Sequence, residues 1–274
     1  MSYAQGPGWK LYRGNCLTIL NGFPDASFDA VITDPPYSSG GTHAPARMAS
    51  TTNKYVQSGC EASSIARGKI EFLGDNRDQR SWTFWCTLWL SECLRLVRPG
   101  GYCLFFIDWR QLPAATDAFQ AAGWMWRGLI AWNKGLGARA PNIAYFRHQC
   151  EYLVWGTNGS IDKSRSGRGP WPGCLTFPVL QSDKFHQTGK PTELLRQLVK
   201  VVPAGSRILD PFAGSATTLR AAVLEGREAV GIELSPHYSS IACERLRACP
   251  SLCPSGSSTN VKPKRRKHLG KQTP

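Results

Sequence analysis

The tetrapeptide Asp34-Pro35-Pro36-Tyr37 combines a carboxylate, a rigid backbone and an aromatic ring. Proline fixes φ and lacks an N–H, so both prolines leave carbonyl oxygens that can only accept hydrogen bonds. The Asp34 carboxylate and the Pro35 carbonyl could accept both protons of an exocyclic amino group, while the Tyr37 ring stacks on the base that carries it. Such contacts would make the amino nitrogen more nucleophilic. The alternative is a Pro-Pro turn in which Asp34 caps the chain and Tyr37 packs.

A second motif, Asp-Pro-Phe-Ala-Gly-Ser-Ala-Thr at residues 210–217, joins a short apolar run to a helical stretch at residues 218–225. Strand, small-residue turn and helix are typical of a cofactor site, but this turn departs from the dinucleotide pattern G-x-G-x-x-G. Asp210 would repel a pyrophosphate and suits a cofactor with a cationic end, such as the ammonium of S-adenosylmethionine. Glu233 ends the next expected strand, where it could accept hydrogen bonds from both ribose hydroxyls. A generic Rossmann-type turn for another nucleotide is the alternative.

Both motifs follow segments that predict buried strands. Phe28–Thr33, Tyr102–Ile107 and Ala229–Ile232 are short apolar runs, as expected for strands covered on both faces of a parallel sheet. Ligands of open α/β sheets bind at the carboxyl ends of the strands, where the first motif would lie. Ser81–Val97 repeats apolar residues every three or four positions and predicts an amphipathic helix with its tryptophans in the core. The sequence therefore predicts a wound α/β sheet.

Composition narrows the function classes. The 274 residues hold 33 Lys and Arg against 19 Asp and Glu, a net charge of +14 that favours a polyanionic partner. No signal peptide and no apolar stretch near the ~18 residues of a membrane span are present, so we expect a cytoplasmic protein without membrane contact. The ten cysteines lie scattered in apolar segments, which predicts buried free thiols. Cys243, Cys249, Cys253 and His268 could bind zinc, but no C-x-x-C pair occurs, so we predict no metal.

Over roughly residues 11–246 the chain resembles the β-class DNA amino-methyltransferases, in which the D-P-P-Y motif precedes the cofactor motif. Further elements of that family occur here in the same order: Pro99-Gly100-Gly101, Trp132-Asn133-Lys134-Gly135, Phe146 to Glu151, and His186 to Pro191 with its pattern H-x-x-x-K-P. The resemblance implies a Rossmann-like methyltransferase fold, with a mostly parallel seven-stranded sheet and helices on both faces.

The resemblance also implies an activity and a cofactor. We expect base flipping in duplex DNA and direct in-line transfer of a methyl group from S-adenosylmethionine to the exocyclic nitrogen. In this family an Asp at the first motif position favours adenine N6, but cytosine N4 stays open because the two pockets are chemically alike. Methylation at cytosine C5 would need a thiolate nucleophile, typically in a Pro-Cys dipeptide, and the sequence has none.

The cofactor site is expected to be built from both motifs and the segments around them. Its residues are Asn15, Cys16, Asp34, Thr188, Lys190, Asp210, Phe212, Gly214, Ser215, Thr217, Glu233 and Leu234. The resemblance places Thr188 and Lys190 near the methionine end. The family usually has Asp where this chain has Asn15, and that Asp receives the amino group of the cofactor's adenine. Because an amide keeps one acceptor oxygen and adds a donor, we expect this contact to be weaker here.

Residues 134–190 are rich in basic and aromatic side chains, which can hold phosphates and reach base edges. We predict DNA contacts by Lys134, Arg139, Arg147, Lys163, Arg165 and Arg168. Residues 156–186 are expected to form the core of a target-recognition region, and residues 38–80 to close over the flipped base. One catalytic domain should span residues 1–249, followed by a basic, disordered tail at residues 250–274.

Duplex DNA is the expected partner, and family analogy allows a homodimer and a separate restriction endonuclease. Three rival functions are weighed against this one. An enzyme for RNA or a free nucleobase should lack a large basic insertion. A non-catalytic DNA-binding subunit should show Asp34 or Gly214 replaced, and both are present. A nicotinamide-dependent oxidoreductase is disfavoured by the acidic turn at residue 210.

Overall fold

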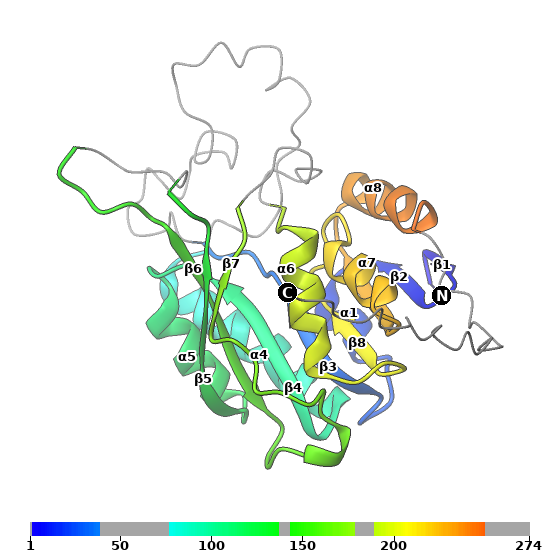
Figure 1. Ribbon diagram of the computed structural model, residues 1–274. Helices are drawn as coiled ribbons and strands as arrows, with labels where there is room; N and C mark the ends of the chain where they lie inside the picture. The colour runs from blue at the N-terminus through cyan, green and yellow to red at the C-terminus, as the bar shows by residue number, and fades with distance from the viewer. Residues whose placement is uncertain (1, 39–76, 137–142, 179–188, 250–274) are drawn as a thin grey trace, which may run out of the picture.

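The structure, a computed structural model, describes residues 2–38, 77–136, 143–178 and 189–249 (Figure 1). Its elements in chain order are β1 (Ala4–Gly6), β2 (Trp9–Arg13), α1 (Cys16–Leu20), β3 (Phe28–Thr33), α4 (Gln79–Leu96), β4 (Val97–Ile107), α5 (Leu112–Ala121), β5 (Met125–Asn133), β6 (Cys150–Thr157), η2 (Lys163–Arg165), β7 (Cys174–Thr176), α6 (Thr192–Leu198), η4 (Val199–Val201), β8 (Arg207–Asp210), α7 (Thr217–Leu224), β9 (Glu228–Glu233) and α8 (Pro236–Arg247).

The strands of the described residues form one sheet in the order β1-β2-β9-β8-β3-β4-β6-β5-β7. The run from β2 to β4 is parallel throughout, whereas β1 and β6 lie antiparallel to their neighbours. The α/β prediction is confirmed, but the expectation of seven mostly parallel strands is corrected to nine strands in a mixed sheet. Only Pro7 and Gly8 join β1 to β2, and so short a connection allows only an antiparallel pair.

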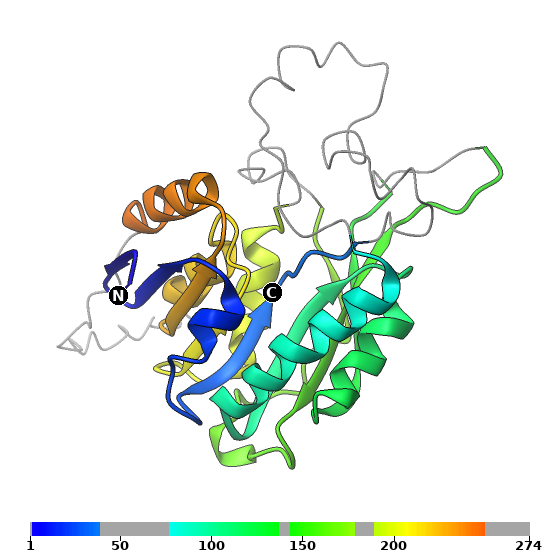
Figure 2. The ribbon, with the colours of Figure 1, turned by 180° about the vertical axis from the view of Figure 1, so that it is seen from behind.

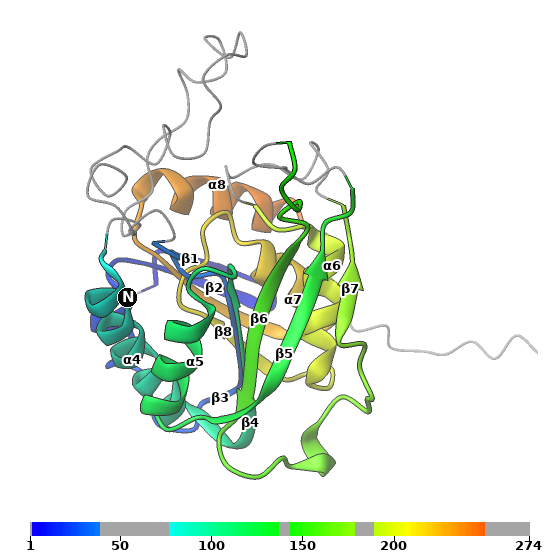
Figure 3. The ribbon, with the colours of Figure 1, turned by 90° about the vertical axis from the view of Figure 1, so that its left-hand side faces the viewer.

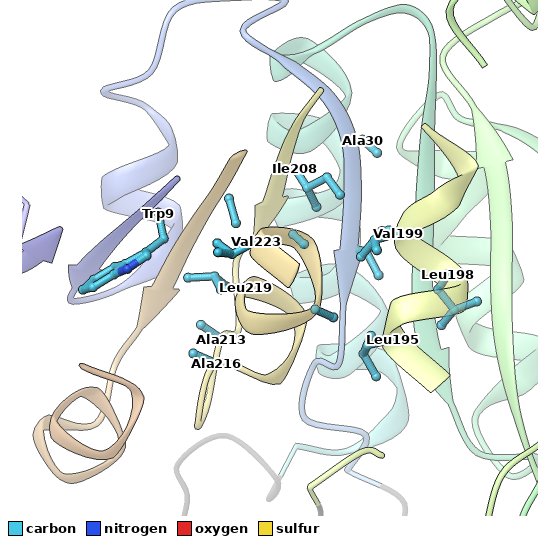
Figure 4. Close-up of a cluster of buried hydrophobic side chains, with 14 of the residues drawn as sticks. Trp9, Ala30, Leu195, Leu198, Val199, Ile208, Ala213, Ala216, Leu219 and Val223 are labelled. Atoms are coloured by element: carbon cyan, nitrogen blue, oxygen red, sulfur yellow. The ribbon is translucent and has the colours of Figure 1, made fainter. Parts of the chain in front are cut away.

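Helices cover both faces of the sheet, as expected (Figures 2 and 3). One face carries α1, α4 and α5, and the other carries α6, α7 and α8. Strand β3 alternates between the two layers: Ala30 and Ile32 join the core under α6 and α7, and Val31 joins the core under α4. Figure 4 shows part of the first core, with Leu219 and Val223 of α7 beside Ile208 of β8. Burial on both faces makes these central strands a rigid base for the residues at their ends.

Helix α4 begins two residues before the predicted start, because Asp78 caps it and accepts hydrogen bonds from the amides of Arg80 and Ser81. Trp82 and Trp89 are fully buried, which confirms the predicted core role of these tryptophans. The helix ends at Leu96, one residue before the predicted end at Val97, because Val97 is already the first residue of β4.

Some expectations fall on residues outside the described ranges. They include nearly all of the predicted closing segment at residues 38–80 and the whole tail at residues 250–274. Within the described ranges, no helix combines the length and apolar character that a membrane span requires. The eight cysteines described there are free thiols, and six of them are buried.

Candidate active site

The two sequence motifs meet because their strands are parallel neighbours. Strand β3 pairs with β8, so Asp34 and Asp210 emerge at the same, carboxyl edge of the sheet. A buried hydrogen bond joins the motifs directly: the hydroxyl of Thr33 donates to Oδ1 of Asp210 at 2.6 Å. The positions of the two motifs are therefore coupled through adjacent strands.

Asp34 lies in a dense polar cluster at this edge. The Tyr37 hydroxyl donates to its Oδ1 at 2.7 Å, and the Lys190 ammonium donates to its Oδ2 at 2.7 Å. Lys190 is only 7% exposed, and its ammonium lies 5.1 Å and 5.9 Å from the ring centres of Phe106 and Trp132. A charge buried among aromatic rings needs anionic partners, so Lys190 fixes the carboxylate that sits beside it.

Glu151 is a second carboxylate of this cluster. Its Oε1 accepts from Lys134 at 3.1 Å, and its Oε2 lies 3.4 Å from both the Lys190 ammonium and the Tyr37 hydroxyl. The β5–β6 pairing brings these residues together, because it sets Trp132 opposite Glu151. Sequence reasoning used Glu151 only as part of a family pattern. The sequence offered one sign of this role: Glu151 is an acidic residue near the start of an apolar strand, 17 residues after Lys134.

These charges shift one another's protonation. Burial raises the pKa of the Asp34 carboxyl above its ordinary value, against the opposing effects of Lys190 and Tyr37. Burial alone would raise the pKa of Glu151, but the ammonium groups of Lys190 and Lys134 hold it below its ordinary value. Burial alone would lower the pKa of Lys190, but the two carboxylates keep it raised. The cluster thus holds two carboxylates around one persistent cation.

The Pro-Pro segment is fixed from the side by α4. The indole N–H of Trp82 donates to the carbonyl of Pro36 at 2.8 Å. This contact assigns the Pro36 carbonyl to the packing of the motif. The role of the Pro35 carbonyl as acceptor for a substrate amino group stays a prediction.

The turn after β8 is held by Glu233 at the end of the neighbouring strand β9. The amide of Gly214 donates to Oε2 of Glu233 at 2.8 Å, and the amide of Ser235 donates to Oε1 at 2.7 Å. Each carboxylate oxygen keeps a second lone pair for a further donor such as a ribose hydroxyl. Helix α7 begins without a side-chain cap, so its first amides can receive an anionic group. Phe212 closes one side against Trp85 and Trp89.

Asp210 makes its contacts inside the protein. It is 2% exposed, and its Oδ1 accepts from the Thr33 hydroxyl and from the Phe212 amide at 3.1 Å. The carboxylate therefore orders the turn, while its predicted direct contact with a cofactor ammonium stays untested. Burial raises the pKa of Asp210 from 3.8 to about 6.

Replacing Asp210 with Asn is expected to change how stability depends on pH. A carboxyl whose folded-state pKa is raised favours folding when protonated, and this contribution is lost as pH rises through about 6. Urea unfolding at several pH values should therefore show the stability of the wild type falling relative to Asp210→Asn between about pH 4 and pH 7, by at most about 3 kcal/mol. The exposed Asp117→Asn serves as control. A pH dependence of Asp210→Asn no larger than that of this control would refute the buried charge.

Asn15 lies beside Glu233, since the amide of Gly14 donates to the Glu233 carbonyl at 2.9 Å. Its side-chain oxygen already accepts from the amide of Leu17 at 3.0 Å and caps α1. Cys16 is buried and Leu234 is half exposed at the same edge. Thr188 lies outside the described residues.

The cap at residue 15 predicts that Asn15→Asp strengthens cofactor binding. A carboxylate has two oxygens, so one can cap α1 while the other accepts from an adenine amino group. Calorimetric titration should give a Kd for S-adenosylmethionine about three- to tenfold lower than in the wild type. Asn15→Ala, which removes the cap as well, should bind more weakly than the wild type. Equal affinity of all three proteins would exclude Asn15 from the site.

The predicted DNA-binding residues separate into distinct places. Lys134 lies inside the polar cluster around Asp34, paired with Glu151, and Arg139 lies outside the described residues. Arg147 is exposed three residues before β6, at the catalytic edge.

The remaining three basic residues, Lys163, Arg165 and Arg168, lie at the opposite edge of the sheet. Arg165 lies 3.8 Å from Asp29 at the start of β3, and the amide of Gly167 donates to the carbonyl of Val201. Strand β6 runs antiparallel to β4, with Tyr102 opposite Thr157, and so it carries the chain away from Asp34. There the carbonyl of Arg165 accepts from Arg98. From here the chain returns through β7, parallel to β5, toward the edge where Asp34 lies, and residues 179–186 of the expected recognition region fall outside the described ranges. DNA contacts by Lys163, Arg165 and Arg168 stay a prediction.

Exposed rings at the catalytic edge were not singled out from the sequence. Trp109, just after β4, is 51% exposed and stacks on His148 with ring centres 5.9 Å apart. The guanidinium of Arg110 lies over the Trp109 ring. Tyr145 and Phe146, three and two residues before His148, are also exposed. Aromatic faces beside cationic groups suit contacts with nucleic-acid bases and phosphates.

Comparison with known proteins bears on this site. A family model described as DNA methylase, of the N6/N4 type, matches residues 28–244. The type II methyltransferase M2.DpnII of Streptococcus pneumoniae is 24% identical over 255 residues, which cover 87% of this chain and 89% of that protein. The M1.HpyAVI–SAM complex has a TM-score of 0.63 at 20% identity, covering 87% of this chain and 98% of that one. The cytosine-N4-specific PvuII DNA methyltransferase has a TM-score of 0.64 at 14% identity, with coverages of 93% and 92%.

Proposed function

This chain belongs to the N6/N4 DNA methylase family, and we propose that it transfers a methyl group from S-adenosylmethionine to the exocyclic N6 of adenine in duplex DNA. The observation that carries the proposal is the placement of Asp34, held by Lys190 and Tyr37 beside the turn that Glu233 orders. The acceptor for an amino group and the turn expected to hold the methyl donor thus share one edge of the sheet.

In this proposal Asp34 binds the amino group of the extruded base. The Tyr37 hydroxyl now occupies Oδ1 of Asp34, so an incoming amino proton would displace it and leave the ring to stack on the base. Lys190 holds the other carboxylate oxygen and keeps Asp34 oriented while Tyr37 moves. After transfer the nitrogen carries an excess proton, and the raised pKa of Asp34 suits this carboxylate to receive it.

The residues around the β8 turn fit S-adenosylmethionine. Glu233 can accept from the ribose, Asn15 lies at the same edge of the sheet, and the uncapped start of α7 suits the carboxylate of the methionine end. When bound, the sulfonium supplies the electrophilic methyl. The protein's task is to hold the acceptor nitrogen in line with that methyl and to exclude water. The M1.HpyAVI complex named with SAM supports this choice of cofactor.

Adenine is proposed over cytosine because an Asp stands at the first position of the D-P-P-Y motif. Cytosine N4 is the second candidate, since the cytosine-N4-specific PvuII enzyme shares the fold. Incubating the protein with S-adenosylmethionine and a mixed-sequence duplex, then hydrolysing the DNA for mass spectrometry, distinguishes the two. N6-methyladenine supports the proposal, and N4-methylcytosine alone overturns the choice of base. Methylation of RNA but not of duplex DNA would overturn the substrate class.

We further propose that DNA approaches the catalytic edge across Trp109, His148 and Arg147. Trp109 and Arg147 are exposed and His148 is half-buried against Trp109 beside the Asp34 cluster, which supports this approach, and the net charge of +14 favours a polyanion. Binding should therefore weaken steeply with salt in gel-shift experiments. A homodimer and a partner endonuclease remain predictions from family analogy.

A further inference from the structure

The turn between β8 and α7 holds a residue in a strained conformation. Ala216 has φ 63° and ψ 35°, in the left-handed region, and it is fully buried. A residue with a Cβ costs about 1 kcal/mol or more there, whereas glycine costs little. Ala216 also occupies the N-cap of α7 and supplies no side-chain hydrogen bond to it. Figure 4 shows Ala216 and Ala213 near Leu219 at the edge of the core. Within the turn the amide of Ala216 donates to the carbonyl of Ala213 at 2.7 Å, and contacts from outside the turn add to this bond.

Arg245 of α8 makes those contacts. The two N–H groups of its Nη1 are shared among three acceptors: the main-chain oxygen of Ser215, the Ser215 hydroxyl at 2.8 Å and the Thr217 hydroxyl at 3.3 Å. The acceptors come from the residues on either side of Ala216. Arg245 is 9% exposed, so its charge is removed from water and depends on these hydrogen bonds.

The choice of arginine matters for this geometry. A guanidinium is a planar donor group of fixed shape, and it is weakly hydrated compared with the ammonium of lysine. It therefore fixes the plane in which the two N–H groups of Nη1 point at the acceptors of the turn. The same β9–α8 segment also holds the other side of the turn, since Glu233 accepts from the amide of Gly214. The turn is thus clamped on both sides by residues that follow it in the chain.

We propose that Arg245 is a positioning residue for the methyl donor: it holds Ser215 and Thr217 in the arrangement that binds S-adenosylmethionine. This inference rests on the proposed function of the turn. Removing Arg245 would let the strained turn relax toward conformations that aim the hydroxyls and the first amides of α7 elsewhere. The sequence did not single out Arg245, because basic residues in a terminal helix usually face solvent.

The test compares Arg245→Met with Arg247→Met, which removes an exposed arginine from the same helix. Arg245→Met should raise both the Kd and the KM for S-adenosylmethionine by about tenfold or more, while the KM for DNA stays within about twofold. Arg247→Met should leave all three constants within about twofold. Arg245→Lys should be intermediate, because the lysine side chain keeps the charge but is one bond too short to place its ammonium where Nη1 lies. Circular dichroism checks that each variant is folded.

A second substitution tests the strain itself. Ala216→Gly alone should change the Kd for S-adenosylmethionine by less than about twofold. Added to Arg245→Lys, the same substitution should lower the Kd by about threefold or more, because glycine removes the strain. If Arg245 served only to stabilise the fold, its replacement would lower the melting temperature, and Ala216→Gly would not restore cofactor affinity. If Arg245→Met fails to fold, Arg245→Lys decides between the two roles.

The outcomes distinguish the inference from the proposed function. If folded Arg245→Met or Arg245→Lys binds S-adenosylmethionine as tightly as Arg247→Met does, the positioning role of Arg245 is wrong. The proposed function of the protein is not affected by that result. A wild-type protein that methylates no DNA and takes up no S-adenosylmethionine overturns the proposed function, and the inference fails with it.

Discussion

Replacing Asp34 with Ala is expected to lower the kcat of methyl transfer by at least about a thousandfold. The substitution removes the acceptor that would bind the amino group and strips Lys190 of its closest anionic partner, 2.7 Å away. The Kd for S-adenosylmethionine should change by less than about threefold, because the turn is ordered by Glu233 and not by Asp34. Single-turnover assays with tritiated cofactor, together with calorimetric titration, measure the two effects separately.

Two further variants make this result specific. Asp34→Asn keeps the shape and one acceptor oxygen but replaces the second acceptor with a donor, so it should retain only a small fraction of activity. Asp117→Ala removes an exposed acid on α5 and should leave activity unchanged. Substantial activity in Asp34→Ala would remove Asp34 from the mechanism.

Replacing Lys190 with Met is expected to have the largest effect on stability. The substitution leaves Asp34 and Glu151 close together without their shared cation, at side-chain exposures of only 28% and 20%. Removing one partner from a buried ionic cluster typically costs about 3–5 kcal/mol. We expect a loss near the lower figure, because both carboxylates keep some contact with water. Urea unfolding at pH 8 measures this loss.

The stability deficit of Lys190→Met should shrink as the pH falls. Without Lys190, burial and repulsion from Glu151 raise the folded-state pKa of the Asp34 carboxyl further above its unfolded value, so protonation of Asp34 stabilises the folded state. Glu151 keeps its ion pair with Lys134. The deficit should therefore be smaller at pH 5 than at pH 8. Lys200→Met is the control, because Lys200 makes only a partly exposed pair with Glu225 at 3.6 Å and should cost less than about 1 kcal/mol. A pH-independent deficit would contradict the proposed charge cluster.

The sequence predicted the parts of the site that short motifs encode. Asp34 to Tyr37 and the β8 turn follow buried strands, and parallel neighbours must bring their carboxyl ends together. The pattern could not give the direction of residues 150–157, because a short apolar strand looks alike in a parallel and an antiparallel sheet. The antiparallel course of β6 brought Glu151 into the catalytic cluster and carried Lys163, Arg165 and Arg168 to the opposite edge.

Contacts between distant segments were also beyond the sequence pattern. Arg245 reaches the turn only because α8 packs back against it, and a basic residue in a helix carries no sign of burial in its neighbours. For Asn15, the sequence showed that an amide stands where the family usually has Asp. Only the structure showed that its side-chain oxygen caps α1. Local motifs thus predicted the chemistry. Strand pairing and helix packing determined which charged side chains lie beside Asp34 and the β8 turn.

The central claim is methylation of an exocyclic amino group that depends on Asp34. DNA isolated from cells that express the wild type or Asp34→Ala can be hydrolysed and its modified nucleosides quantified by mass spectrometry. We predict N6-methyladenine in the wild-type sample and background levels in the Asp34→Ala sample. Methylation confined to carbon 5 of cytosine, or equal N6-methyladenine in both samples, would contradict the account.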